Sequence, residues 1–121
     1  MKANAIMSAL GGLVLTVSVA DAGAWTFDEC SSKIGLLKDA IEMSDFTNDR
    51  DRVRLALKAD AADMKLKEAK FSGSIQKIGD IEFKVGGLLG ADKEKLKRID
   101  GDVILELAAG AITCIEGLMG D

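Results

Sequence analysis

The stretch from Ser72 to Gly90, SGSIQKIGDIEFKVGGLLG, decides the fold of this chain, because it fits two different secondary structures. Five of its apolar residues recur at intervals of three or four, which is the spacing of one buried helix face. These residues are Ile75, Ile78, Ile81, Val85 and Leu88. Each glycine inside a helix costs about 1 kcal/mol relative to alanine, so the five glycines of the stretch oppose this reading. We favour the helix.

The alternative is a β-hairpin at about residues 74–86. Residues 81–85 (IEFKV) alternate apolar and polar, and Gly79-Asp80 is suited to a two-residue hairpin turn. Periodicity alone does not separate the two structures. The sequence thus predicts an all-α fold, a small bundle of three or four helices closed by one disulfide, with an α+β fold as the alternative.

The segment that opens the domain carries a helix start signal. In Thr26-Phe27-Asp28-Glu29, the threonine hydroxyl and the glutamate carboxylate can each accept from a free backbone amide, which is a capping box. The apolar residues behind it fall at helical spacing: Phe27, Cys30, Ile34, Leu37 and Ile41. We therefore expect a first helix with the Cys30 sulfur directed into the core.

A second helix is predicted from Asp49 to Lys70, with Thr47 or Asn48 as its cap. Its expected core stripe is Val53, Leu57, Ala61, Met64 and Phe71. Asp63 and Lys67 are four residues apart and should pair on the solvent side. On this pattern Met64 fills the core.

The last helix is expected to begin at Asp92 as its cap. Its predicted stripe is Leu96, Ile99, Val103, Leu107, Cys114 and Leu118. From residue 103 to residue 120 only two residues are charged, and the apolar arc is about 200° wide, more than a one-sided surface helix needs. The helix is therefore either central in the bundle or covered by another protein. In the second case Leu105, Ile112 and Met119 are the expected partner-binding anchors.

Residues 1–24 have the pattern of a secretory signal peptide. Lys2 is followed by a run of 16 residues that is apolar apart from small hydroxyl residues, and Ala22-Gly23-Ala24 has the small-x-small form that signal peptidase cleaves. The run is shorter than the roughly 20 residues a bilayer span requires. We expect one helical domain at 25–121, located in the periplasm or outside the cell.

Export makes the two cysteines interpretable. In an oxidising compartment an even pair most simply forms one disulfide, here Cys30 with Cys114, although two interchain bridges in a dimer are the alternative. The closed loop of about 85 residues corresponds to roughly 4–5 kcal/mol in the chain-entropy description. The pairing would bring the first and last helices side by side.

Composition argues against several kinds of chemistry. The chain has no histidine, the commonest general base and metal ligand, and both thiols are expected to be bonded. The acidic spacing from Asp45 onward lacks the Gly and Glu of a calcium loop, at Arg50 and Ala56. The net charge of −4 disfavours nucleic acid as a partner. We predict no enzyme activity, no catalytic residues, no metal and no cofactor.

Two features are weaker candidates for contact with a partner. Arg50, Arg52 and Arg54 are interleaved with aspartates, and arginine is favoured at interfaces. Trp25 either packs on the first helix or is an exposed anchor.

The predicted function is an exported non-catalytic binding protein, such as an inhibitor, immunity-type protein, chaperone or adaptor, that acts through an apolar helix face. Its partner would be another protein or a second copy of itself, with no membrane span. The alternative function is a carrier of a small apolar ligand held between the helices.

Overall fold

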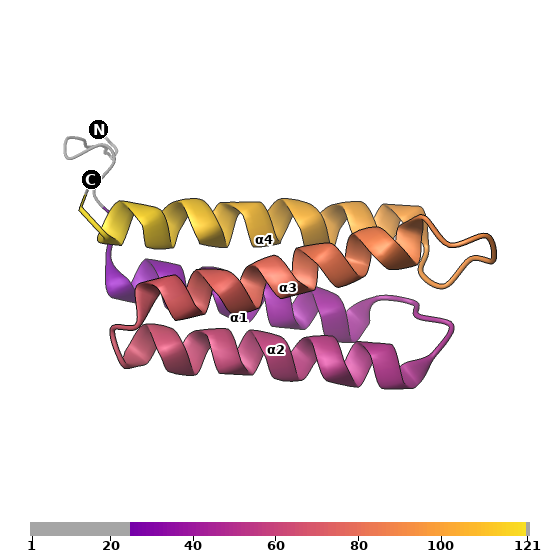
Figure 1. Cartoon of the computed structure of the whole chain (residues 1–121), viewed down its shortest axis with the longest axis horizontal. Helices are drawn as coiled ribbons and strands as arrows, with labels where there is room; N and C mark the ends of the chain where they lie inside the picture. The colour runs from indigo at the N-terminus through magenta and orange to yellow at the C-terminus, as the bar shows by residue number, and fades with distance from the viewer. Residues whose placement is uncertain (1–24, 121) are drawn as a thin grey trace, which may run out of the picture.

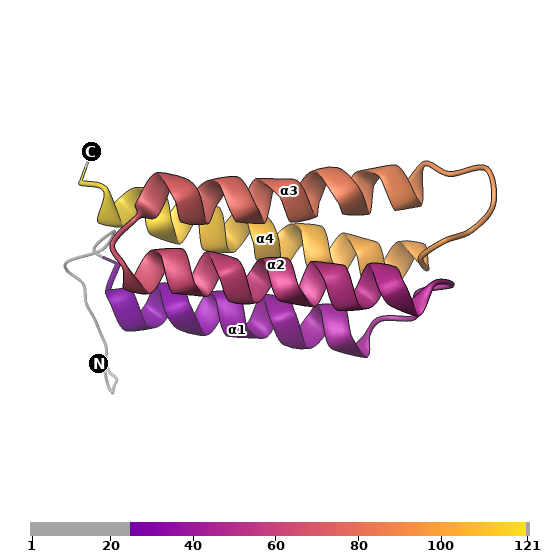
Figure 2. The same cartoon turned by 60° about the horizontal axis from the view of Figure 1, so that its bottom comes forward.

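The structure is a computed structural model that describes residues 25–120. This part of the chain contains four helices. They are α1 (Phe27–Met43), α2 (Asp49–Lys67), α3 (Phe71–Leu89) and α4 (Arg98–Leu118). The helices alternate in direction along one long axis (Figure 1). Each packs on two neighbours, in the order α1, α2, α3, α4 and back to α1, which makes a closed ring (Figure 2). The predicted all-α bundle closed by a disulfide is confirmed in its four-helix form.

The predicted signal peptide, residues 1–24, lies outside the described residues. Within residues 25–120, none of the helices has both the length and the apolar character that crossing a bilayer requires.

The ambiguous stretch is helix α3, so the hairpin alternative at about 74–86 is wrong. Its buried residues are Ser74, Ile78, Ile81, Val85 and Leu88, a single face at helical spacing. Burial of each large aliphatic side chain contributes about 1.5–3 kcal/mol, which exceeds the cost of a glycine in the helix. Gly79, Gly86 and Gly87 lie where an added Cβ would meet nothing within 4 Å. Tertiary burial therefore decides for the helix over local propensity.

Helix α1 begins as predicted. The Thr26 hydroxyl accepts from the Glu29 amide at 3.1 Å, and the Glu29 carboxylate accepts from the Thr26 amide at 2.9 Å. Four of the five predicted stripe residues are buried: Cys30, Ile34, Leu37 and Ile41. Phe27 is partly exposed and packs edge-on against Phe71, with ring centroids 6.2 Å apart.

The predicted core stripe of α2 is wrong. Val53, Leu57 and Met64 are exposed, and the residues that face the core are Leu55, Ala56, Ala59, Ala62 and Leu66. This helix carries two apolar stripes on different sides, and only one can face the bundle. The alanine-rich stripe faces inward, where small side chains permit close approach of neighbouring helices. Met64 is thus not core filler.

The ends of α2 match the prediction only in part. The Asn48 side chain caps the helix, accepting from the Arg50 amide at 2.9 Å, and Lys67 pairs with Asp63 at 3.1 Å. The helix ends at Lys67 rather than Lys70, because Ala69 adopts a left-handed backbone with φ of 61°. The chain then turns directly into α3.

The predicted cap at Asp92 is also wrong, because residues 90–97 form a loop and α4 begins at Arg98. Leu96 is buried in that loop and forms an isolated antiparallel bridge with Phe46. The Thr47 amide donates to the Lys95 carbonyl at 2.9 Å, and the Thr47 hydroxyl donates to the Glu94 carbonyl at 2.9 Å. These bonds between two loops at the same end of the bundle hold residues 94–96 out of a helix.

Helix α4 lies between α1 and α3. Its core residues are Gly101, Ile104, Ala108, Ala111, Cys114 and Ile115. Ile99 and Val103 are exposed, so this part of the predicted stripe is wrong. Cys114 is bonded to Cys30 of α1, with their Cα atoms 5.5 Å apart. The disulfide is intrachain, as predicted.

Candidate functional site

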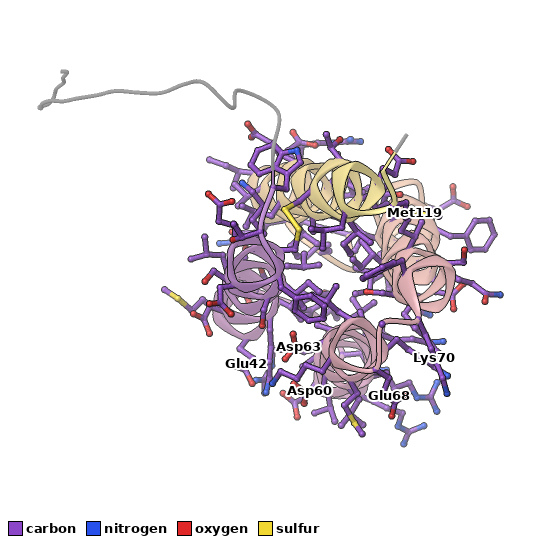
Figure 3. The ribbon with its side chains drawn as sticks, turned by 90° about the vertical axis from the view of Figure 1, so that its left-hand side faces the viewer. Glu42, Asp60, Asp63, Glu68, Lys70 and Met119 are labelled. Carbon is purple, nitrogen blue, oxygen red and sulfur yellow. A yellow bond between two sulfur atoms is a disulfide. The ribbon has the colours of Figure 1, made fainter. Side chains whose placement is uncertain are left out.

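The three predicted partner-binding anchors do not form one exposed face. Leu105 and Ile112 are partly buried and pack against the core. Met119 follows α4 and is 49% exposed, at the α3 side of that end of the bundle (Figure 3). The wide apolar arc of α4 is used by contacts with two neighbouring helices. The partner-binding role of these residues stays a prediction.

Phe83 of α3 is the most exposed large apolar side chain among the described residues, at 87%. It lies on the side of α3 away from the buried stripe, because it is two residues from both Ile81 and Val85. The sequence analysis did not name Phe83 as a partner-binding residue, because it looked for exposed apolar residues on the last helix. A helical-wheel projection of α3 places Phe83 opposite the buried stripe and would have identified it.

A surface hollow lies on each side of Phe83. The first has a volume of about 410 Å³ and is lined by Phe83 with Arg54, Leu55, Lys58, Asp80 and Lys84. The second has a volume of about 400 Å³ and is lined by Phe83 with Asp51, Lys84, Gly87, Leu88, Ala91 and Lys95. Both lie along the seam of α2 and α3. We call the residues Arg54, Lys58, Phe83, Lys84 and Lys95 the Phe83 face.

The Phe83 face carries an excess of positive charge. Lys58 pairs with Asp80 at 3.1 Å, and Lys84 pairs with Asp51 at 3.6 Å. Arg54 and Lys95 form no ion pair with any residue in the range 25–120. Two cations are thus left without an internal partner beside an exposed aromatic ring.

Charge is segregated across the whole bundle. Helices α1 and α4 together contain eight acidic and three basic residues. Helices α2 and α3 together contain six acidic and eight basic residues. Because α1 packs on α4 and α2 packs on α3, one side of the ring is negative and the opposite side is positive.

The negative side also exposes apolar residues. They are Leu36 and Met43 on α1, and Ile99 and Val103 on α4. Asp39 of α1 and Glu106 of α4 are exposed on the same pair of helices. We call these six residues the acidic face.

Trp25 lies at the end of this side. It packs against Gly117 of α4, where a Cβ would collide with the ring, and the Lys33 ammonium lies 5.3 Å from the ring centroid. A third hollow of about 370 Å³ lies beside it, lined by Trp25, Asp28, Glu29, Ser32, Lys33 and Leu36. Trp25 therefore joins the start of α1 to the end of α4 and is partly buried.

Two polar contacts join α1 to α2 along their seam. Ser31 donates to Asp63 at 2.8 Å, and Lys38 pairs with Asp60 at 3.0 Å, with both aspartates on the side of α2 near α1 (Figure 3). The hydrogen bond and negative charge of Asp60 raise the pKa of Lys38 above its ordinary value. This seam offers less unpaired charge to a partner than the Phe83 face does.

The arginine cluster is divided by the fold. Arg52 pairs with Asp49 of the same helix, while Arg54 lines the hollow beside Phe83. Only Arg54 contributes to the Phe83 face.

Among residues 25–120, no three His, Cys, Asp or Glu side chains are grouped so as to hold a metal ion. Comparisons with protein-family models, with curated proteins and with solved structures found no match to this chain.

Proposed function

We propose that this chain is an exported, non-catalytic binding protein that holds a partner protein at the Phe83 face. The observation that carries the proposal is the 87% exposure of Phe83 between two hollows. An exposed aromatic ring flanked by concave surface is the arrangement in which interface anchors are found.

The energetics fit a moderate, specific contact. Complete burial of a phenylalanine side chain contributes about 1.5–3 kcal/mol. The surrounding cations add specificity and association rate more than affinity. The Cys30–Cys114 disulfide supports a location outside the cytoplasm, where such bonds persist. Export to the periplasm or the exterior is part of the proposal.

The proposed binding site, the Phe83 face, differs from the site on α4 that the sequence predicts. Leu105 and Ile112 are partly buried against the core, so a partner could not reach them fully without displacing the side chains packed around them. The substitution Ile112→Asp should therefore destabilise the fold itself, whereas Phe83→Ser should leave it intact.

Photo-crosslinking tests the proposed site. A benzoylphenylalanine at position 83 is compared with one at position 57, because Leu57 of α2 is also exposed but lines neither of the two hollows beside Phe83. In the native host, position 83 should give a discrete protein adduct and position 57 should not. Phe83→Ser should abolish stable association at unchanged melting temperature.

The same adducts from both positions, or none from position 83, would contradict the proposal. An apolar small molecule that co-purifies with the wild-type protein, in place of a protein adduct, would favour the carrier function instead.

A further inference from the structure

The partner of the Phe83 face follows from the charge pattern of the bundle. We propose that this partner is a second copy of the chain, which docks through its acidic face in a head-to-tail contact. The inference rests on the proposed function, since it names the occupant of the same site. The two faces lie on opposite sides of one molecule, so each copy presents both halves of the contact.

The charges of the two faces are complementary. Arg54 and Lys95 of the Phe83 face lack partners within the described chain. Asp39 and Glu106 of the acidic face are likewise in none of the ion pairs of residues 25–120, and both are exposed. Opposite charges that are unpaired in the monomer can pair between copies, which steers association.

The apolar groups also correspond. The Phe83 face offers one aromatic ring between two hollows. The acidic face offers flexible and branched aliphatic side chains, among which Met43 is 85% and Ile99 is 72% exposed. Contact would remove apolar surface from water on both copies.

The charge pattern favours a head-to-tail contact over a two-fold symmetric dimer. A symmetric contact brings each face against itself, and would set Arg54 and Lys95 near their own copies. Like charges placed opposite one another are repulsive. A head-to-tail contact joins unlike faces and leaves one of each free at the ends.

The available area is sufficient for a weak specific interface. A 19-residue helix is about 28 Å long, and a pair of neighbouring helices is about 20 Å wide. A contact of that size buries about 1,100 Å² in total, which is just below the range of stable specific interfaces and within that of weak, transient ones. We therefore expect association that depends strongly on concentration and salt.

The test uses two charge-reversed variants of the mature chain. The first, Arg54→Glu with Lys95→Glu, alters the Phe83 face. The second, Asp39→Lys with Glu106→Lys, alters the acidic face. All four residues are exposed, and circular dichroism with thermal melting verifies that both variants fold.

Sedimentation gives the readout. At about 10 mM salt, where screening extends over roughly 30 Å, the wild-type protein should form species larger than a dimer as its concentration rises. Each variant alone should associate at least about tenfold more weakly. An equimolar mixture should recover association beyond a dimer. The unchanged acidic face of the first variant meets the unchanged Phe83 face of the second, and the two reversed faces are again opposite in charge.

A wild-type protein that stays monomeric at low salt, or a mixture that behaves like the separate variants, would overturn the inference. The crosslink at position 83 then separates the two proposals. An adduct with a different protein leaves the proposed function standing, while no adduct removes both.

Discussion

Gly101 shows at the scale of one residue how the helices are fitted together. A Cβ at this position would lie 2.6 Å from the Leu89 Cδ2 atom of α3, closer than real Cβ contacts. Gly110 is nine residues further along the same helix, and a Cβ there would meet nothing within 4 Å. Two glycines of one helix thus serve different roles, and only the structure distinguishes them.

We expect Gly101→Ala to destabilise the protein by about 1–3 kcal/mol, because Leu89 must leave its packed position. Gly110→Ala should stabilise it by about 0.5–1 kcal/mol through helix propensity alone. Urea unfolding of both variants measures the difference. Equal stabilities for the two variants would mean that Leu89 moves aside at no cost.

Other single residues could be assigned from the sequence. The capping box of Thr26 and Glu29 depends only on local chemistry. The pairing of Cys30 with Cys114 follows because each cysteine has only one possible partner in the chain. The exposure of Phe83 could not be assigned in this way, because it depends on which of two periodicities the segment adopts.

At the scale of the element, α3 is the helix in which local propensity and tertiary burial disagree most. Its glycines at positions 79, 86 and 87 lie where an added side chain has room. They weaken the helix, and the burial of Ile78, Ile81 and Val85 offsets this loss.

Gly79→Ala and Gly86→Ala should each raise the free energy of unfolding by about 1 kcal/mol. The double variant should add the two effects, since neither new methyl meets a neighbour within 4 Å. Chemical unfolding followed by circular dichroism checks this. A loss of stability would contradict this prediction and would mean that the segment needs its glycines for a turn.

Helices α2 and α4 show where element predictions fail. In α2 two apolar stripes have similar spacing, and the sequence does not tell which one meets the bundle. For α4 the predicted start at Asp92 is too early. Leu96 has helical spacing with the residues of α4, but it is buried in a loop that is hydrogen-bonded to the loop before α2.

At the scale of the whole molecule, the disulfide joins two residues that are 84 positions apart and ties α1 to α4. It closes the ring of helices at the end where the start of α1 meets the end of α4. Trp25 packs on Gly117 at the same end.

Reduction of Cys30–Cys114 should lower the free energy of unfolding by roughly 4–5 kcal/mol, since it frees a loop of this length in the unfolded chain. Domains of this size have total stabilities of about 5–15 kcal/mol, so this loss is a large share of the total. Urea titrations with and without reductant measure the loss. A change below about 1 kcal/mol would indicate that the unfolded chain stays compact without the bond.

The sequence by itself determined that the chain is rich in helix, where α1 starts and which two cysteines are available to pair. These follow from helical periodicity, from a capping motif within four residues and from the presence of only two cysteines. The tertiary structure decided that α3 is a helix, which stripe of α2 faces the core, and that Phe83 lies exposed between two hollows. It also placed the acidic helices opposite the basic ones. The physical reason is that burial and charge complementarity depend on neighbours distant in the chain, which spacing along one helix does not specify.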